Sequence, residues 1–191
     1  METLAVSTGV VALGEVGDKT QLLALLLAAR FRRPWPIVWG ILVATLANHT
    51  LAAALGTWIT RWADPALLRW VLGGSFIAVA VWMLIPDRID DENPRGAGRA
   101  GAWSVFGVTT FAFFLAEMGD KTQVATVMLA ARYDSLLVVT AGTTLGMMIA
   151  NVPAVWLGET AVKRLPVQTV HRIAAAVFAA IGVAVLAGVG A

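Results

Sequence analysis

Six long apolar stretches follow one another along the chain and leave little sequence between them. A helix needs about 20 mostly apolar residues to cross a hydrocarbon core of about 30 Å. The predicted spans are Leu4–Ala29, Pro36–Trp58, Leu67–Ile85, Ala102–Ala131, Leu136–Gly158 and Gln168–Gly190. Since 59% of the residues are hydrophobic and only 14% are charged, we predict an all-α membrane protein with lipid around it and exclude a soluble enzyme.

The basic residues of the short loops predict the orientation of the chain. Cytoplasmic loops carry an excess of Lys and Arg. The loops after the first, third and fifth spans contain nine such residues, and those after the second and fourth contain three. Both termini are therefore predicted on the periplasmic side of a cell inner membrane. The net charge of +2 is small and the basic residues form no patch, so nucleic acid is not an expected partner.

An internal repeat organises the chain. Residues 15–30 (EVGDKTQLLALLLAAR) match residues 117–132 (EMGDKTQVATVMLAAR) at ten of sixteen positions, at an offset of 102 residues. The same offset relates Phe76 to Phe178, while Asn48 and Asn151 correspond to within one residue. The chain therefore reads as two copies of one unit.

Each copy holds three of the predicted spans. The first repeat is assigned to residues 1–86, a cytoplasmic linker to 87–101 and the second repeat to 102–191. Because three is odd, the second copy must cross the membrane in the opposite sense. We predict six transmembrane helices as two inverted three-helix repeats, related by a pseudo-two-fold axis in the membrane plane.

Six ionisable residues stand inside the repeated apolar segments, although Asp or Lys at a helix centre costs about 2.5 to 3.5 kcal/mol each. They are Glu15, Asp18 and Lys19 in the first copy, and Glu117, Asp120 and Lys121 in the second. At about 1.5 Å per residue from the start of its span, Glu15 lies about 17 Å deep, near the midplane. Glu117 is similarly deep from the other side, so the two acidic clusters are expected to meet.

Local spacing suggests roles for the neighbours of these carboxylates. Lys19 follows Glu15 by four residues and can pair with it on one helix face. Gly17 and Gly119 remove side-chain bulk, which would let the two motif helices cross closely. Whether the motif helices break at their glycines stays open at this stage.

Four carboxylates and two ammonium groups sum to a formal charge of −2, which one divalent cation neutralises. The candidate metal ligands are Glu15, Asp18, Glu117 and Asp120, with Thr20, Gln21, Thr122, Gln123, Asn48 and Asn151 as additional candidates. Oxygen ligands of this kind suit Mn²⁺, Ca²⁺ or Mg²⁺. The four amides serve equally well as hydrogen-bond partners between helices. Lys19 and Lys121 either gate the empty site or act as counterions, and His49 is expected to be a packed polar residue.

Proton exchange follows from the same carboxylates. Without a cation, four close carboxylates cannot all stay ionised, so at least one is expected to hold a proton. Cation entry would expel that proton. This competition is the physical basis of metal/proton antiport.

The doubled E-x-G-D-[KR]-[TS] motif resembles that of a family of small six-span cation/proton exchangers, which includes bacterial manganese exporters, chloroplast manganese transporters and a Golgi transmembrane protein. Glu15, Gly17, Asp18, Lys19 and Thr20 fit the first motif, and Glu117, Gly119, Asp120, Lys121 and Thr122 fit the second. The resemblance covers the whole chain. It implies export of Mn²⁺, or in some members Ca²⁺, from the cytoplasm in exchange for protons, with the paired motifs as the ion site.

Two alternatives remain at this stage. A six-span exporter of amino acids or small organic solutes would need a larger and less acidic cavity. A non-transporting membrane subunit would use its buried charges to assemble with a partner. No cofactor is expected, since Mn²⁺ or Ca²⁺ is the transported substrate. Assembly as a homo-oligomer is left open.

Overall fold

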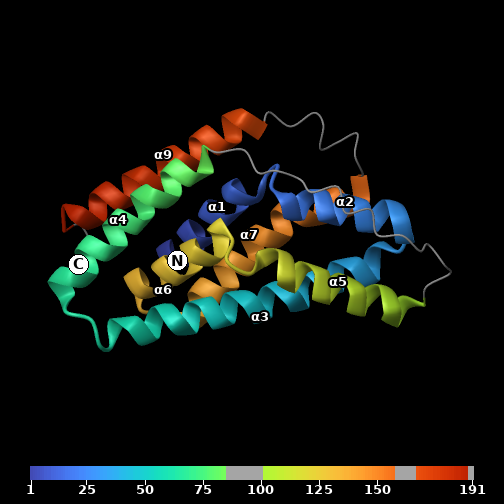
Figure 1. Cartoon of the computed structure of the whole chain (residues 1–191), viewed down its shortest axis with the longest axis horizontal. Coiled ribbons are helices and arrows are strands. Elements are labelled where there is room, and N and C mark those ends of the chain that lie inside the picture. The colour runs from blue at the N-terminus through green and yellow to red at the C-terminus, as the bar shows by residue number, and fades with distance from the viewer. Residues whose placement is uncertain (85–100, 158–166, 189–191) are drawn as a thin grey trace.

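The computed structural model describes residues 1–84, 101–157 and 167–188, which form eight helices and no strand (Figure 1). The helices are α1 (Glu2–Glu15), α2 (Lys19–Phe31), α3 (Pro34–Thr60), α4 (Pro65–Met83), α5 (Ala102–Glu117), α6 (Lys121–Tyr133), α7 (Leu136–Leu157) and α9 (Val167–Leu186). The predicted linker at residues 87–101 lies outside the described residues, apart from Gly101.

Local sequence signals fix several helix ends. Proline occupies the first turn of both α3 and α4, where its missing N–H costs no hydrogen bond. The Asp64 carboxylate caps α4 by accepting from Ala66 N at 2.9 Å and Leu67 N at 3.1 Å. Helices α2 and α6 both end at a left-handed residue, Arg32 and Asp134, which are 102 positions apart in the sequence.

Four of the described helices, α3, α4, α7 and α9, are long and apolar enough to cross a membrane, and α5 with α6 makes a fifth span if the bent pair is one span. Two predicted spans, Leu4–Ala29 and Ala102–Ala131, are each divided into two helices. The 14 residues of α1 rise only about 21 Å, which is less than a hydrocarbon core. Helix α1 alone is therefore too short to cross a membrane, and the pair of α1 with α2 is not among the candidate spans of the described residues.

The helices of the two halves pack against each other in equivalent pairs. Helix α1 lies along α7 as α5 lies along α3, and α4 packs on α9. In Figure 1, α1 and α2 lead towards the right of the view, and α5 and α6 lead back towards the left. The two divided segments therefore run in opposite directions.

Close contacts repeat at the offset found in the sequence. A Cβ on Gly40 would lie 2.7 Å from Thr109 Cβ, and one on Gly142 would lie 2.7 Å from Ser7 Cβ. Thr109 and Ser7 are themselves 102 residues apart. The same close approach of a glycine to a side chain of the packed helix thus occurs in both halves.

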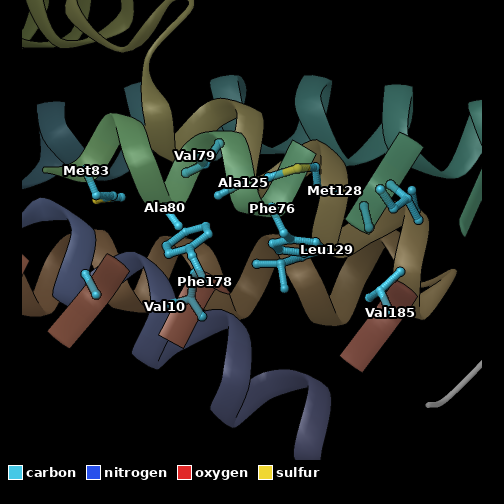
Figure 2. Close-up of a cluster of buried hydrophobic side chains, with 14 of the residues drawn as sticks. Val10, Phe76, Val79, Ala80, Met83, Ala125, Met128, Leu129, Phe178 and Val185 are labelled. Atoms are coloured by element: carbon cyan, nitrogen blue, oxygen red, sulfur yellow. The ribbon is translucent and has the colours of Figure 1, made fainter. Parts of the chain in front are cut away.

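The apolar core between α4 and α9 contains a pair of equivalent residues in direct contact. The rings of Phe76 and Phe178 have centroids 6.1 Å apart, and both are fully buried in the cluster drawn in Figure 2. Phe76 and Phe178 are 102 residues apart, so counterparts from the two halves meet in this core. This core holds the two halves together next to α1 and α6.

The register between α3 and α7 differs from the one expected from their asparagines. Nine of the ten buried residues of α3 have a buried counterpart in α7 at an offset of 102, and the tenth corresponds to a residue outside the described ranges. This register pairs Asn48 with Ala150 and His49 with Asn151. Asn48 and Asn151 therefore correspond to within one residue, as expected, and are not exact counterparts.

All eight tryptophans are exposed on the helices and their connections. Trp82, for example, lies one residue before the end of α4 at Met83. Aromatic rings near helix ends are typical of the interface between membrane and water. The exposed tryptophans thus agree with a chain that is surrounded by lipid.

Candidate metal centre

Each repeated motif is a helix break. Helix α1 ends at Glu15 and α2 begins at Lys19, while α5 ends at Glu117 and α6 begins at Lys121. The intervening residues have almost the same backbone in both copies, with φ and ψ of −64° and 115° at Val16 and of −63° and 121° at Met118. The bend between α5 and α6 is 72°. The helices therefore break at the motif glycines. The sequence alone had left open whether they do.

The glycines of both motifs adopt a backbone conformation that the turn requires. Gly17 has φ of 81° and Gly119 has φ of 73°, a left-handed conformation that glycine adopts without the clash of a Cβ. A Cβ built on Gly119 would meet nothing within 4 Å. The expectation that Gly119 removes bulk to let helices approach is wrong.

Two glutamines stabilise the breaks. The Gly17 N–H donates to Gln21 Oε1 at 2.9 Å, and the Gly119 N–H donates to Gln123 Oε1 at 2.7 Å. At a break the backbone N–H groups lose their helical carbonyl partners, so a side chain must accept from them. Gln21 also donates to the Ala150 carbonyl on α7 at 2.8 Å. In this conformation both glutamines are hydrogen-bond partners.

The breaks bring the carboxylates of the two motifs together. Glu15, Asp18, Glu117 and Asp120 are all buried, with at most 3% of each residue exposed. Oxygen atoms of Glu15, Asp18 and Asp120 lie within 4.8 Å of one another. Glu117 is not one of these three, but its carboxylate is within electrostatic range of all of them. We call these four residues the carboxylate cluster.

A threonine orients each glutamate of the cluster. Thr20 Oγ1 donates to Glu15 Oε2 at 2.6 Å, and Thr122 Oγ1 donates to Glu117 Oε2 at 3.1 Å. The second oxygen of each glutamate, Oε1, is buried and has no hydrogen-bond partner among the described residues. Each glutamate thus keeps one oxygen for a ligand.

The lysines pair across the two halves. Lys19 Nζ lies 2.8 Å from Asp120 Oδ1, and Lys121 Nζ lies 3.4 Å from Asp18 Oδ1. The expected pairing of Lys19 with Glu15 is wrong because the helix breaks between them and the i, i+4 relation is lost. The two crossed ion pairs differ in one respect: the Lys19 side chain is 37% exposed, whereas that of Lys121 is 1% exposed.

The asparagines lie on the long helices that flank the breaks. Asn48 Nδ2 donates to the Phe114 carbonyl at 2.9 Å, and Asn151 Nδ2 donates to the Met147 carbonyl at 3.1 Å. Both Oδ1 atoms are buried without a hydrogen-bond partner in the described part of the chain. Asn151 is also close enough to Glu15 to interact with its carboxylate. Both amides therefore have an oxygen available.

The sequence analysis missed one residue beside the first break. His171 of α9 lies with Nε2 2.8 Å from the Val16 carbonyl, which the end of α1 leaves without a helical partner. The corresponding position in the first half is Arg69, so the repeat could not reveal this contact. The only available signal was that the chain has two histidines.

Comparisons with known proteins identify a family model that matches both halves of the chain. The family model described as "Divalent cation/proton antiporter GDT1" matches the chain twice, at residues 3–91 and at residues 105–190. The two matches begin 102 residues apart, the offset of the repeat. No solved structure matches the chain.

Curated relatives carry the same family name or a manganese label. A protein of Vibrio cholerae serotype O1 named "Putative manganese exporter" is 48% identical over 182 residues, covering 93% of this chain and 87% of that protein. A GDT1-like protein of Synechocystis is 30% identical over 88% of each chain. The rice GDT1-like protein 3 is 26% identical over 93% of this chain and 71% of its own length. The chain therefore belongs to the GDT1 family of divalent cation/proton antiporters.

Proposed function

We propose that this protein exports a divalent cation from the cytoplasm in exchange for protons, with Mn²⁺ as the main substrate and Ca²⁺ as a second. The observation that carries the proposal is the buried triplet of Glu15, Asp18 and Asp120 oxygens within 4.8 Å, drawn from both motifs. The name of the Vibrio cholerae relative supports manganese. The family description supports antiport.

The charge of the carboxylate cluster fits one divalent ion. Its four carboxylates and the two lysines paired with them sum to −2, so a bound Mn²⁺ makes the group neutral. Carboxylate, amide and hydroxyl oxygens are the ligands that such a cation prefers. We assign Glu15, Asp18, Glu117 and Asp120 as its ligands, with Asn48 and Asn151 as additional oxygen donors.

The crossed ion pairs suggest how the empty site is kept stable. Lys19 and Lys121 hold the two aspartates, which are otherwise like charges in a medium of low dielectric constant. An incoming cation competes with both ammonium groups for these oxygens. We assign the lysines a gating role, in which they release the aspartates when the ion binds.

Protons and the cation then use the same oxygens in turn. The cytoplasmic-facing site loses protons to a near-neutral solution and loads metal. The outward-facing site takes protons from a more acidic periplasm and releases metal, since ligation requires deprotonated carboxylates.

We infer a six-span architecture in which α1 with α2, and α5 with α6, each form one broken span. The opposite directions of these segments and the contacts repeated at 102 residues support two inverted three-helix repeats. Residues 1–86 and 102–191 are the repeats, with 87–101 as a cytoplasmic linker. The termini are assigned to the periplasmic side of the inner membrane.

Purified protein in liposomes tests the transport reaction. With Mn²⁺ outside and a pH-sensitive dye inside, Mn²⁺ entry should make the weakly buffered lumen more alkaline as protons leave. The Glu15→Gln variant, which keeps the shape and loses the charge, is the matched control and should move neither ion. Mn²⁺ flux without proton movement would indicate a uniporter or channel and would overturn the antiport proposal.

Thiol labelling tests the topology, because the chain contains no cysteine and single-cysteine variants need no other change. An impermeant reagent added to intact cells whose outer membrane has been made permeable should label Ala63→Cys, between α3 and α4. The Arg33→Cys variant, between α2 and α3, should react only after lysis. The reverse pattern would invert the assigned orientation.

A further inference from the structure

His49 is a fully buried histidine that the reaction described above does not use. None of its surface is exposed, and neither ring nitrogen has a hydrogen-bond partner among the described residues. A polar group buried in this way is costly unless something satisfies it. The groups around the His49 ring therefore indicate which ligand its nitrogen atoms bind.

The repeat supplies those surroundings. At the register of 102 residues, His49 on α3 is the counterpart of Asn151 on α7, and Asn151 lies close enough to Glu15 to interact with its carboxylate. Helix α3 packs along α5 as α7 packs along α1. The repeat therefore predicts Glu117 as the equivalent neighbour of His49.

A direct contact supports this placement. Asn48 Nδ2 donates to the Phe114 carbonyl at 2.9 Å, and Phe114 precedes Glu117 by three residues, or about one turn of α5. This contact places the turn of α3 that contains Asn48 and His49 beside the last turn of α5. Glu117 Oε1 is itself buried without a hydrogen-bond partner in the described ranges.

We propose that His49 is a nitrogen ligand of the transported cation on the Glu117 side of the carboxylate cluster, and that it makes the site prefer Mn²⁺ to Ca²⁺ and Mg²⁺. The inference rests on the proposed function. Ca²⁺ and Mg²⁺ are bound almost entirely by oxygen, whereas imidazole is a good ligand for first-row transition metals. A site made only of oxygen ligands would lack the nitrogen ligand that favours Mn²⁺ over Ca²⁺ and Mg²⁺.

The two halves then contribute differently to one site. The second half offers the amide oxygen of Asn151 beside Glu15, and the first half offers an imidazole at the equivalent place. Replacing His49 by asparagine would give both halves the same residue at this one position. His49→Asn is therefore the variant that separates selectivity from transport.

The first test measures Mn²⁺ and Ca²⁺ uptake by wild-type and variant proteoliposomes. His49→Asn should reduce the ratio of Mn²⁺ to Ca²⁺ transport efficiency about tenfold, a typical loss when the surroundings of a bound metal are altered, with Ca²⁺ uptake retained. Thr45→Val is the matched control, since Thr45 is also buried on α3 with an unpartnered hydroxyl. Its ratio should equal that of wild type.

The second test uses the wild-type protein and so does not depend on the folding of His49→Asn. Pulsed electron paramagnetic resonance of Mn²⁺ bound to the wild-type protein should show coupling to a directly bound ¹⁴N nucleus. Because the chain has two histidines, His171→Asn is the control and should keep that coupling.

The outcomes separate the two proposals. No divalent cation transport by the wild type would overturn the proposed function. Normal transport with an unchanged Mn²⁺ to Ca²⁺ ratio in His49→Asn, or bound Mn²⁺ without ¹⁴N coupling, would overturn the role of His49 alone.

Discussion

Asp18 and Asp120 occupy equivalent positions in the two motifs but pair with lysines in unlike surroundings. The Lys121 side chain that pairs with Asp18 is 1% exposed, whereas the Lys19 side chain that pairs with Asp120 is 37% exposed. Water can solvate the Lys19 ammonium group if its partner is lost. It cannot do so for Lys121 without a rearrangement of the core.

We predict that Asp120→Asn and Asp18→Asn both abolish transport and differ in stability. Asp120→Asn should change the free energy of unfolding by less than about 1 kcal/mol, because water can solvate the Lys19 ammonium group that loses its partner. Asp18→Asn removes a partner of a buried charge and should cost up to about 3 kcal/mol. Flux assays with unfolding in mixed detergent measure both quantities. Wild-type flux in both variants would make the aspartates structural.

Gly119 tests whether the motif glycine is required for its backbone or for its size. Its φ of 73° means that Gly119→Ala should destabilise the protein by about 1 to 2 kcal/mol. Gly119→Asn should cost less, because asparagine tolerates this conformation better than alanine. Gly107→Ala, within α5 and with open space around it, should be neutral or stabilising. A larger loss for asparagine than for alanine in unfolding experiments would favour a role in close packing.

The helices show which features the sequence could predict. Apolar length placed α3, α4 and α7 to within two residues of their observed ends, because a long apolar run has few other stable structures in lipid. The breaks were not predicted because a glycine within an apolar run fits both a kink and a continuous helix. The hydrogen bonds from Gly17 and Gly119 to Gln21 and Gln123 involve side chains that could equally have faced another helix.

The close packing of α3 on α5 and of α7 on α1 leads to two equivalent predictions, one in each half. Gly40→Ala and Gly142→Ala would each place a Cβ 2.7 Å from a side chain of the packed helix. Both should destabilise the protein by about 1 to 3 kcal/mol, the usual range for overpacking, and by similar amounts. Gly74→Ala, on α4 with nothing within 4 Å, is the control. Unequal losses in unfolding experiments would contradict an equivalent packing of α3 on α5 and α7 on α1.

At the scale of the whole molecule, the repeat predicted which residues correspond but not which ones touch. Equivalent residues can lie far apart, or meet in the core as Phe76 and Phe178 do. The exchange of lysine partners between the motifs depends on how the halves pack, and sequence spacing within one motif carries no information on it. The one-residue difference between Asn48 and Asn151 arises because helix register, and not residue identity, decides which residues correspond.

The pH dependence of metal affinity is a property of the whole transport cycle and tests its central assumption. If protons and Mn²⁺ compete for the carboxylate cluster, the apparent affinity for Mn²⁺ must fall as the pH falls, because binding requires deprotonated ligands and releases their protons. Each proton released should weaken binding by up to about tenfold per pH unit. Titration of the purified protein with Mn²⁺ at a series of pH values measures this slope.

The rate of transport should depend on pH as Mn²⁺ binding and release do. A more acidic external solution should speed Mn²⁺ release at the outer face, while acidification of the loading side should slow uptake. Collapsing the pH gradient at a fixed metal gradient should therefore slow export. Because Thr122 donates to one oxygen of Glu117 and the other oxygen has no hydrogen-bond partner among the described residues, Thr122→Val should shift the pH dependence without abolishing binding. Mn²⁺ affinity that is independent of pH, with flux unchanged by the gradient, would separate the proton from the metal site and rule out direct competition.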